Sequence, residues 1–146
     1  MRAFQAPAPP LAVPAPELTV VEQGTTPEGK RRLRLRLTSP RGAAEGVLYI
    51  PVAAPLESAV VEGRSISFAN PTPGGPLYSI LRLRTLPPQG IEIEVVLGES
   101  APQEWYVVDQ SYGLPPGGEA LQKARPATAV SFQDGDVTAV SRKVRI

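Results

Sequence analysis

Two glutamates, Glu92 and Glu94, have a spacing that could support hydrolytic chemistry. They alternate with apolar residues in the predicted strand Ile91–Leu97, so both carboxylates lie on one face with Cα atoms about 6.5–7 Å apart. This separation resembles the two-carboxylate arrangement of glycoside hydrolases. However, the chain contains only one Trp, four Tyr and three Phe, and no group of aromatic residues flanks the pair to stack on a sugar. We therefore interpret the two glutamates as surface residues.

Arginines form a second candidate, because cations at alternate strand positions can bind phosphates when they are unpaired and flanked by aromatic rings. They lie in two predicted strands, as Arg32, Arg34, Arg36, Arg82 and Arg84. With 15 basic and 14 acidic residues, the chain has a net charge of +1 and no general attraction for polyanions. We expect no nucleic-acid partner.

Cross-strand ion pairs explain these arginines without a ligand. If Leu86–Gly90 closes a hairpin, Arg84 lies opposite Glu92, and Arg82 lies opposite Glu94. Arg36 would face Glu17 in the same way. Opposite charges at facing strand positions are mutually stabilising on a solvated sheet, so the sequence favours a self-paired surface.

Catalytic and metal-binding groups are scarce in the rest of the chain. Histidine and cysteine are absent from all 146 residues, which removes the commonest zinc ligands, bases and activated thiols. The segment Gln133–Asp136 contains Asp-Gly, a strong turn signal, but lacks the further ligands of a calcium loop. No Gly-x-Ser-x-Gly or Ser-x-x-Lys motif occurs. We expect no catalytic residue, no metal site and no cofactor in this segment, and hence no enzyme.

The elements that would position these residues are short strands. Apolar residues alternate with polar ones, as in Leu33, Leu35 and Leu37, and turn residues recur every 8–12 positions. This pattern predicts an all-β fold: a single antiparallel β-sandwich of 8–9 strands, immunoglobulin- or fibronectin-III-like, over residues 17–146. Residues 1–16, rich in Pro and Ala, form an extended tail or linker. Gly118–Ala124 holds one helical turn at most, and no apolar run is long enough to insert into a membrane.

A segment near the C-terminus contains the candidate structural or interface residues. Trp105 and Tyr106 occupy adjacent strand positions, so one anchors the core and the other is partly exposed. Asp109 is predicted to leave the strand and accept amide hydrogens in the following turn. Gly113 permits a positive φ there, and Arg125 is predicted to pair with Asp109 and fix the long loop. The structural role is favoured over a ligand site, although Tyr112 remains available to a ligand.

Several stretches of the chain carry a family resemblance. They are VVDQSYGLP (Val107–Pro115), KARP (Lys123–Pro126), DGDVT (Asp134–Thr138), SRKVRI (Ser141–Ile146), LRLRLTSPRGA (Leu33–Ala43) and VVEGR (Val60–Arg64). Together they resemble the C-terminal end of bacterial membrane-bound members of peptidase family 28, the zinc aminopeptidase-like exopeptidases.

That resemblance implies a non-catalytic accessory domain, tethered on the extracytoplasmic (periplasmic) side through upstream membrane helices. Zinc is expected only in the upstream peptidase domain, because no position here matches the family's histidine ligands. The implied partners are the upstream peptidase and membrane domains, which this domain would position, cap or help to assemble, with homo-oligomerisation left open. The alternative is a carbohydrate- or peptide-binding module that uses a sheet edge or the loops 70–76 and 111–126.

Overall fold

The computed structural model describes residues 7, 9–53, 56–68, 74–98, 102–130 and 135–146. Those residues form nine strands and one short helix. The strands are β1 (Glu17–Thr25), β2 (Arg31–Thr38), β3 (Glu45–Pro51), β4 (Leu56–Val61), β5 (Arg64–Ile66), β6 (Tyr78–Leu83), β7 (Ile91–Leu97), β8 (Glu104–Tyr112) and β9 (Val137–Arg145). The helix is α1 (Glu119–Ala124).

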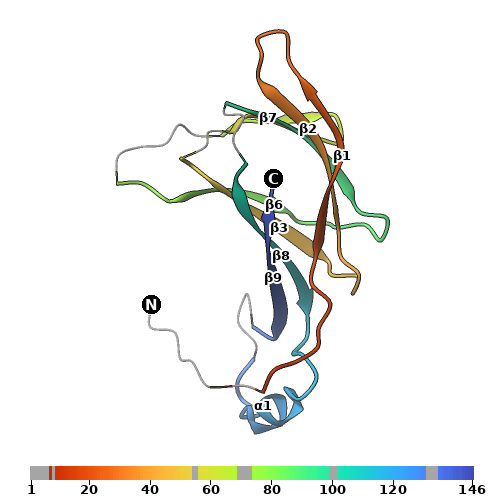
Figure 1. Cartoon of the computed structure of the whole chain (residues 1–146). Helices are drawn as coiled ribbons and strands as arrows, with labels where there is room; N and C mark the ends of the chain where they lie inside the picture. The colour runs from red at the N-terminus through yellow and green to blue at the C-terminus, as the bar shows by residue number, and fades with distance from the viewer. Residues whose placement is uncertain (1–6, 8, 54–55, 69–73, 99–101, 131–134) are drawn as a thin grey trace.

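The strands form two antiparallel sheets that pack face to face (Figure 1). One sheet has the order β1-β2-β7-β4-β5 and the other the order β6-β3-β8-β9. In the centre of the sheets β2 pairs with β7 and β3 pairs with β8, so strands far apart in the sequence lie side by side, as in Greek-key sandwiches. The predicted all-β sandwich of 8–9 strands is confirmed.

The core lies between the sheets and consists of alternate residues from each strand. Leu33, Leu35 and Leu37 of β2 are fully buried, whereas the arginines between them are exposed. Trp105 of β8 is the largest buried side chain, and its indole N–H donates to Gln103 Oε1 at 3.1 Å. Burying one such leucine stabilises the fold by about 1.5–3 kcal/mol, so the period-two pattern seen in the sequence determines which face of each strand points inward.

Two hairpins form in the five-stranded sheet, whereas the hairpin predicted around Leu86–Gly90 is wrong. β1 pairs with β2, and β4 pairs with β5 through Glu62 and Gly63, which both have positive φ. β6 and β7, however, belong to different sheets. The segment between them directs Leu86 into the core, where it is 7% exposed, and its N–H donates to Ala44 O at 2.8 Å. Leu86–Gly90 therefore carries the chain from one layer to the other rather than closing a hairpin.

The predicted ion pairs based on that hairpin are also wrong. Arg82 and Arg84 lie near Glu45, at 3.8 and 3.7 Å, and not opposite Glu94 and Glu92. Glu17 is in register with Thr38 rather than with Arg36, because the register of β1 and β2 is shifted by two residues from the predicted one. Arg36 instead donates to Glu92 of β7 at 2.5 Å.

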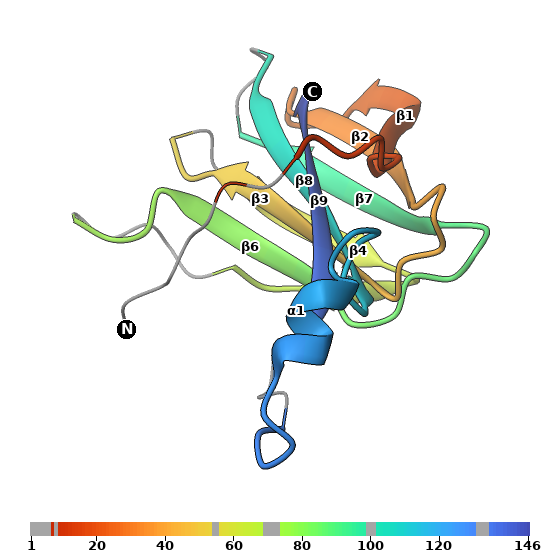
Figure 2. The ribbon, with the colours of Figure 1, turned by 90° about the horizontal axis from the view of Figure 1, so that it is seen from below.

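A segment between β8 and β9 projects from one end of the sandwich and contains α1 (Figure 2). The helix spans six residues, more than the single turn predicted, and none of its residues is buried. Residues 9–16 lie at the same end in Figure 1 and contain no helix or strand, although Pro16 is fully buried against the sandwich. Of the predicted loop 70–76, residues 70–73 fall outside the described residues. Among those described, no helix is both long and apolar enough to cross a membrane.

Candidate functional site

The candidate site forms around Asp109, which is completely buried. Its side chain points from β8 into the space between the sheets, where it meets the connection from β2 to β3. Arg41 donates to Asp109 Oδ1 from Nε at 3.1 Å and from Nη2 at 2.7 Å, while the Ser39 hydroxyl donates to Oδ2. Both carboxylate oxygens are therefore satisfied, as a buried charge requires.

Arg41 extends this network to the fourth strand of the same sheet. Its Nη2 also donates to the backbone carbonyls of Asp109 and Thr138, at 3.1 and 3.0 Å, and its Nη1 donates to the Ser111 hydroxyl. The Arg41 side chain is only 12% exposed. Through Arg41, the connection between β2 and β3 is thus bonded to both β8 and β9.

Local turn chemistry places Arg41 in this position. The Gly42 N–H donates to Ser39 O at 3.0 Å, and Gly42 has φ of 65°, a conformation that favours glycine. The Ser39 hydroxyl also accepts the Ala43 N–H at 3.0 Å. This tight turn directs the side chains of Ser39 and Arg41 towards Asp109.

The predicted roles of Asp109 and Arg125 require correction. Asp109 does not leave the strand but lies inside β8, paired in register with Gly46 and Val140. Arg125 forms its ion pair with Asp136 and not with Asp109. Its hydrogen bond to the Asp136 carboxylate raises the pKa of Arg125 above its ordinary value. Asp109 is therefore bonded by a residue that the sequence analysis did not assign to it.

Arg125 and Gly113 fix the base of the projecting segment. Gly113 has φ of 97°, as predicted, and its N–H donates to Asp136 O at 2.6 Å. The Thr138 hydroxyl donates to Gly113 O at 2.8 Å. Asp136, at the end of the projecting segment, therefore accepts two hydrogen bonds. Its carbonyl accepts one from Gly113 at the beginning of the segment, and its carboxylate accepts one from Arg125 within it.

Trp105 and Tyr112 have opposite environments. Trp105 is fully buried in the core and Tyr106 is 36% exposed, which confirms that the two adjacent aromatic residues point to opposite faces. Tyr112, at the end of β8, is 75% exposed. Trp105 is therefore unable to contact a ligand, whereas Tyr112 is accessible to one.

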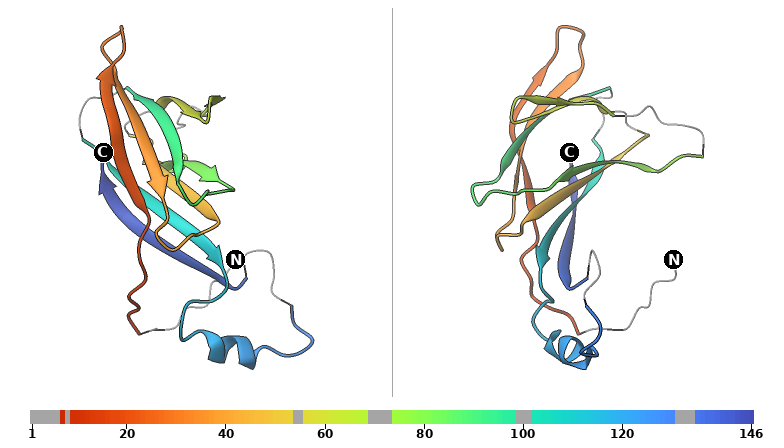
Figure 3. Two further views of the ribbon diagram at one scale, coloured as in Figure 1. Left: turned by 90° about the vertical axis from the view of Figure 1, so that its right-hand side faces the viewer. Right: turned by 180° about the vertical axis from the view of Figure 1, so that it is seen from behind.

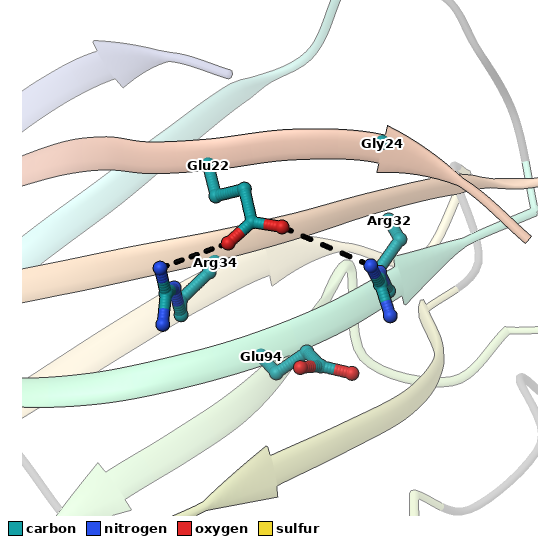
Figure 4. Close-up of a pocket in the computed structure, with 5 residues that line it drawn as sticks. All are labelled: Glu22, Gly24, Arg32, Arg34 and Glu94. Atoms are coloured by element: carbon teal, nitrogen blue, oxygen red, sulfur yellow. Dashed lines mark ion pairs between the residues drawn. The ribbon is translucent and has the colours of Figure 1, made fainter.

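The outer face of the five-stranded sheet carries a lattice of exposed charges (Figure 4). Glu22 lies between two arginines, 2.8 Å from Arg34 and 3.9 Å from Arg32, and Glu94 lies on the neighbouring strand β7. These side chains, with Gly24, line a shallow depression of about 220 Å³. Anions and cations alternate across it, so their fields largely cancel and the depression offers little to a polyanion.

The outer face of the four-stranded sheet is different and was missed by the sequence analysis. Tyr78 packs edge-to-face against Tyr49, with ring centroids 6.2 Å apart, and against Tyr106, with centroids 5.8 Å apart. Lys143 lies 5.7 Å from the centre of the Tyr106 ring. Three of the four tyrosines of the chain thus form one cluster, together with the 54% exposed Ile80, which is in register with Tyr49.

A weak signal for this cluster was present in the sequence. Tyr49 and Tyr106 each lie between two residues that point into the core, so both were bound to face outward. Only the pairing of β3 with β8, in which Tyr49 and Tyr106 are direct partners, brings them together. The signal was therefore incomplete without the topology.

The acidic side chains were also compared with the requirements of a metal site. Within the described residues, no three acidic side chains converge in a way that could hold a metal ion. Gln133 and Asp134 of the predicted turn fall outside those residues.

Comparison of the chain with protein-family models, with curated proteins and with solved structures found no match.

Proposed function

We propose that this chain is a non-catalytic accessory domain of a membrane-anchored, zinc-dependent metallopeptidase similar to peptidase family 28. It would act on the extracytoplasmic side, where it positions or caps the upstream peptidase domain or supports its assembly. The observation that supports this proposal is that three of the stretches carrying the resemblance meet at Asp109. Leu33–Ala43 supplies Arg41, Val107–Pro115 supplies Asp109, and Asp134–Thr138 supplies the carbonyl of Thr138.

The end of the sandwich around this network is the proposed docking end. Residues 9–16, which would follow an upstream domain, lie at the same end of the sandwich as α1 (Figure 1). Leu121 of α1 and Val130 are 72% and 89% exposed. An apolar side chain exposed on a projecting segment is available for contact with another domain.

Two experiments test this proposal. The recombinant chain with added zinc should not hydrolyse aminoacyl substrates, and zinc-dependent turnover would contradict the non-catalytic role. In the parent protein, Leu121→Glu should weaken association of this domain with the peptidase domain in a pull-down of the separately expressed parts. Leu77→Glu is the matched control, because Leu77 is equally exposed, at 76%, but lies before β6. Equal effects of the two variants would exclude α1 as the docking element.

A second candidate function is a carbohydrate- or peptide-binding module, and the tyrosine cluster supports it. Tyrosine combines a flat apolar ring with a hydroxyl group and is enriched at binding surfaces for that reason. Tyr106→Ala should abolish a hit on a glycan or peptide array, whereas Tyr112→Ala, outside the cluster, should retain it. A change at Trp105 would test folding rather than binding, because that side chain is buried.

A further inference from the structure

β9 is the longest regular edge strand of the molecule's described part. It pairs with β8 over nine consecutive positions without a register shift, and no strand pairs with its other side among the described residues. In Figure 3 (left) it forms the margin of its sheet. Its outward side therefore presents a row of backbone N–H and C=O groups to which another chain can add.

The other three edges are protected in ways that β9 is not. β1 contains a register shift between Val20 and Glu22, which interrupts regular pairing. β5 has only three residues, and β6 offers six positions against the nine of β9. Bulges and short strands are the devices that prevent addition of a further strand, so β9 is the edge best suited to accept one.

The charge of β9 indicates which strand it accepts. Arg142, Lys143 and Arg145 are all exposed. Lys143 is paired with Glu104 at 3.0 Å, which raises the pKa of Lys143, whereas Arg142 and Arg145 have no ion-pair partner in the part of the chain that is described. On the outer face, beside Lys143, Arg145 is thus a cation without an ion-pair partner among the described residues, next to a free backbone edge, and this favours an acidic partner.

A groove beside β9 provides room for such a strand. It is open, has a volume of about 490 Å³, and is lined by Glu17–Thr19 of β1 and by Arg142–Arg145 of β9. Leu18 and Val144, both partly buried, supply its apolar part. A strand that pairs with β9 would direct one set of alternate side chains towards this groove and the other set to the outer face beside Tyr106.

We propose that β9 binds an extended acidic peptide as an added strand of the four-stranded sheet. Carboxylates level with Lys143 and Arg145 lie on the outer face, where they meet these cations, while apolar side chains level with Val144 pack towards the groove. The peptide therefore alternates acidic and apolar residues. Backbone hydrogen bonds supply affinity and the alternating side chains supply selectivity, as in other cases of strand addition. This inference does not rest on the family resemblance.

The charges disfavour two other occupants. A second copy of β9, paired antiparallel, would set three cations of each copy beside Val137–Val140 of the other, with no carboxylate on either strand. The N-terminal residues 1–16 contain five prolines, which lack the donor that a strand requires, and no acidic residue. An acidic peptide from another chain matches β9 in both charge and backbone.

The test is binding of a labelled, end-capped peptide of nine alternating Val and Glu residues, followed by fluorescence anisotropy. We expect saturable binding that weakens at least tenfold when Lys replaces Glu in the peptide, and when alternate amides are N-methylated. Arg145→Glu should weaken binding at least tenfold as well. Arg64→Glu, an exposed arginine on the edge strand β5, is the matched control and should leave the affinity unchanged.

The site is located by amide chemical shifts of the labelled protein, which should change along β9. Shifts confined to β6 or to the tyrosine cluster would overturn the proposal, as would equal affinity for the Lys peptide or the N-methylated peptide. A dimer seen by light scattering and abolished by Arg145→Glu would assign the edge to a second copy instead. Absence of saturation up to about 1 mM peptide would also reject it. Thermal melts of both variants confirm that they fold.

Discussion

The charges of this molecule lie in two contrasting environments. Arg41 and Asp109 form one ion pair between the sheets, where the exposed fractions of their side chains are 12% and 0%. On the outer face of the five-stranded sheet, Glu22 and Glu92 each lie near two arginines, but all these side chains are 41–53% exposed. More ion pairs therefore lie on the outer face, where the side chains are hydrated, than between the sheets, where they are buried.

The comparison shows that burial, rather than the number of pairs, determines what a charge contributes. An exposed pair is screened by water and salt and orders two flexible side chains for little gain. A buried carboxylate that loses its partner has no water to replace it. Asp109 should therefore tolerate change far less than any residue of the outer lattice.

The largest effect is expected for Asp109→Ala. Removing the carboxylate leaves the Arg41 guanidinium buried without its counter-ion and should lower the free energy of unfolding by about 3–5 kcal/mol. For a domain of this size the melting temperature falls by roughly 10–15 °C. Thermal unfolding followed by circular dichroism measures it. A loss no greater than that of an outer-lattice variant would remove the distinction between the two environments.

Arg41→Lys should have an intermediate effect, because it keeps the charge and removes the planar donor group. One ammonium is unable to reach Asp109, Ser111 and the Thr138 carbonyl together, so we expect a loss of about 1–3 kcal/mol. Denaturant titration measures the change. If Arg41→Lys unfolds as easily as Asp109→Ala, the hydrogen-bond geometry rather than the charge is what stabilises the network.

Glu92→Gln should have a small effect. Glu92 is hydrated and its partners Arg34 and Arg36 remain solvated without it, so the melting temperature should change by no more than about 2 °C. Raising the salt concentration should reduce even this difference, because ions screen exposed pairs. A salt-insensitive loss comparable to that of Arg41→Lys would show that the lattice acts as a single network.

The smallest signal concerns pH. The hydrogen bond from Arg36 lowers the pKa of Glu92 below its ordinary value. The pair of Glu92 with Arg36 therefore stabilises the folded chain at pH values above the unfolded-state pKa of Glu92. This stabilisation is lost as the pH falls through the lower, folded-state pKa. Carboxyl NMR titration should show the lowered pKa in the native chain and a return towards the ordinary value in Arg36→Met. An unchanged pKa in that variant would exclude Arg36 as the cause.

Local pattern was sufficient to predict the fold, but not the partners of particular residues. Alternating leucines in β2 determine its buried face whatever the strand pairs with, so the sandwich could be predicted. The alternating pattern could not show whether β6 and β7 form a hairpin, because Leu86 is apolar whether it lies in a turn or in the core. Only the burial of Leu86 in the core, with its N–H donating to the Ala44 carbonyl, distinguishes the two cases.

The candidate site could be predicted only in part. In the sequence, Asp109 lies in a segment with turn chemistry, and Arg125 is the next arginine downstream that could reach it across the long loop. Arg41 lies 68 residues away from Asp109 along the chain, and the Greek-key topology alone brings the two together. The same limit applies to Tyr49, Tyr78 and Tyr106, which come from three strands.

The pairing of β2 with β7 has a consequence for the order of synthesis. β2 acquires its second neighbour strand only after the ribosome has released Ile91–Leu97. The first hairpin therefore emerges with one backbone edge of β2 unpaired and with its leucines not yet covered by the opposite sheet. Such non-local pairing gives slow folding, in the range of milliseconds to seconds. During that interval the exposed arginines that alternate with those leucines oppose aggregation of the nascent chain.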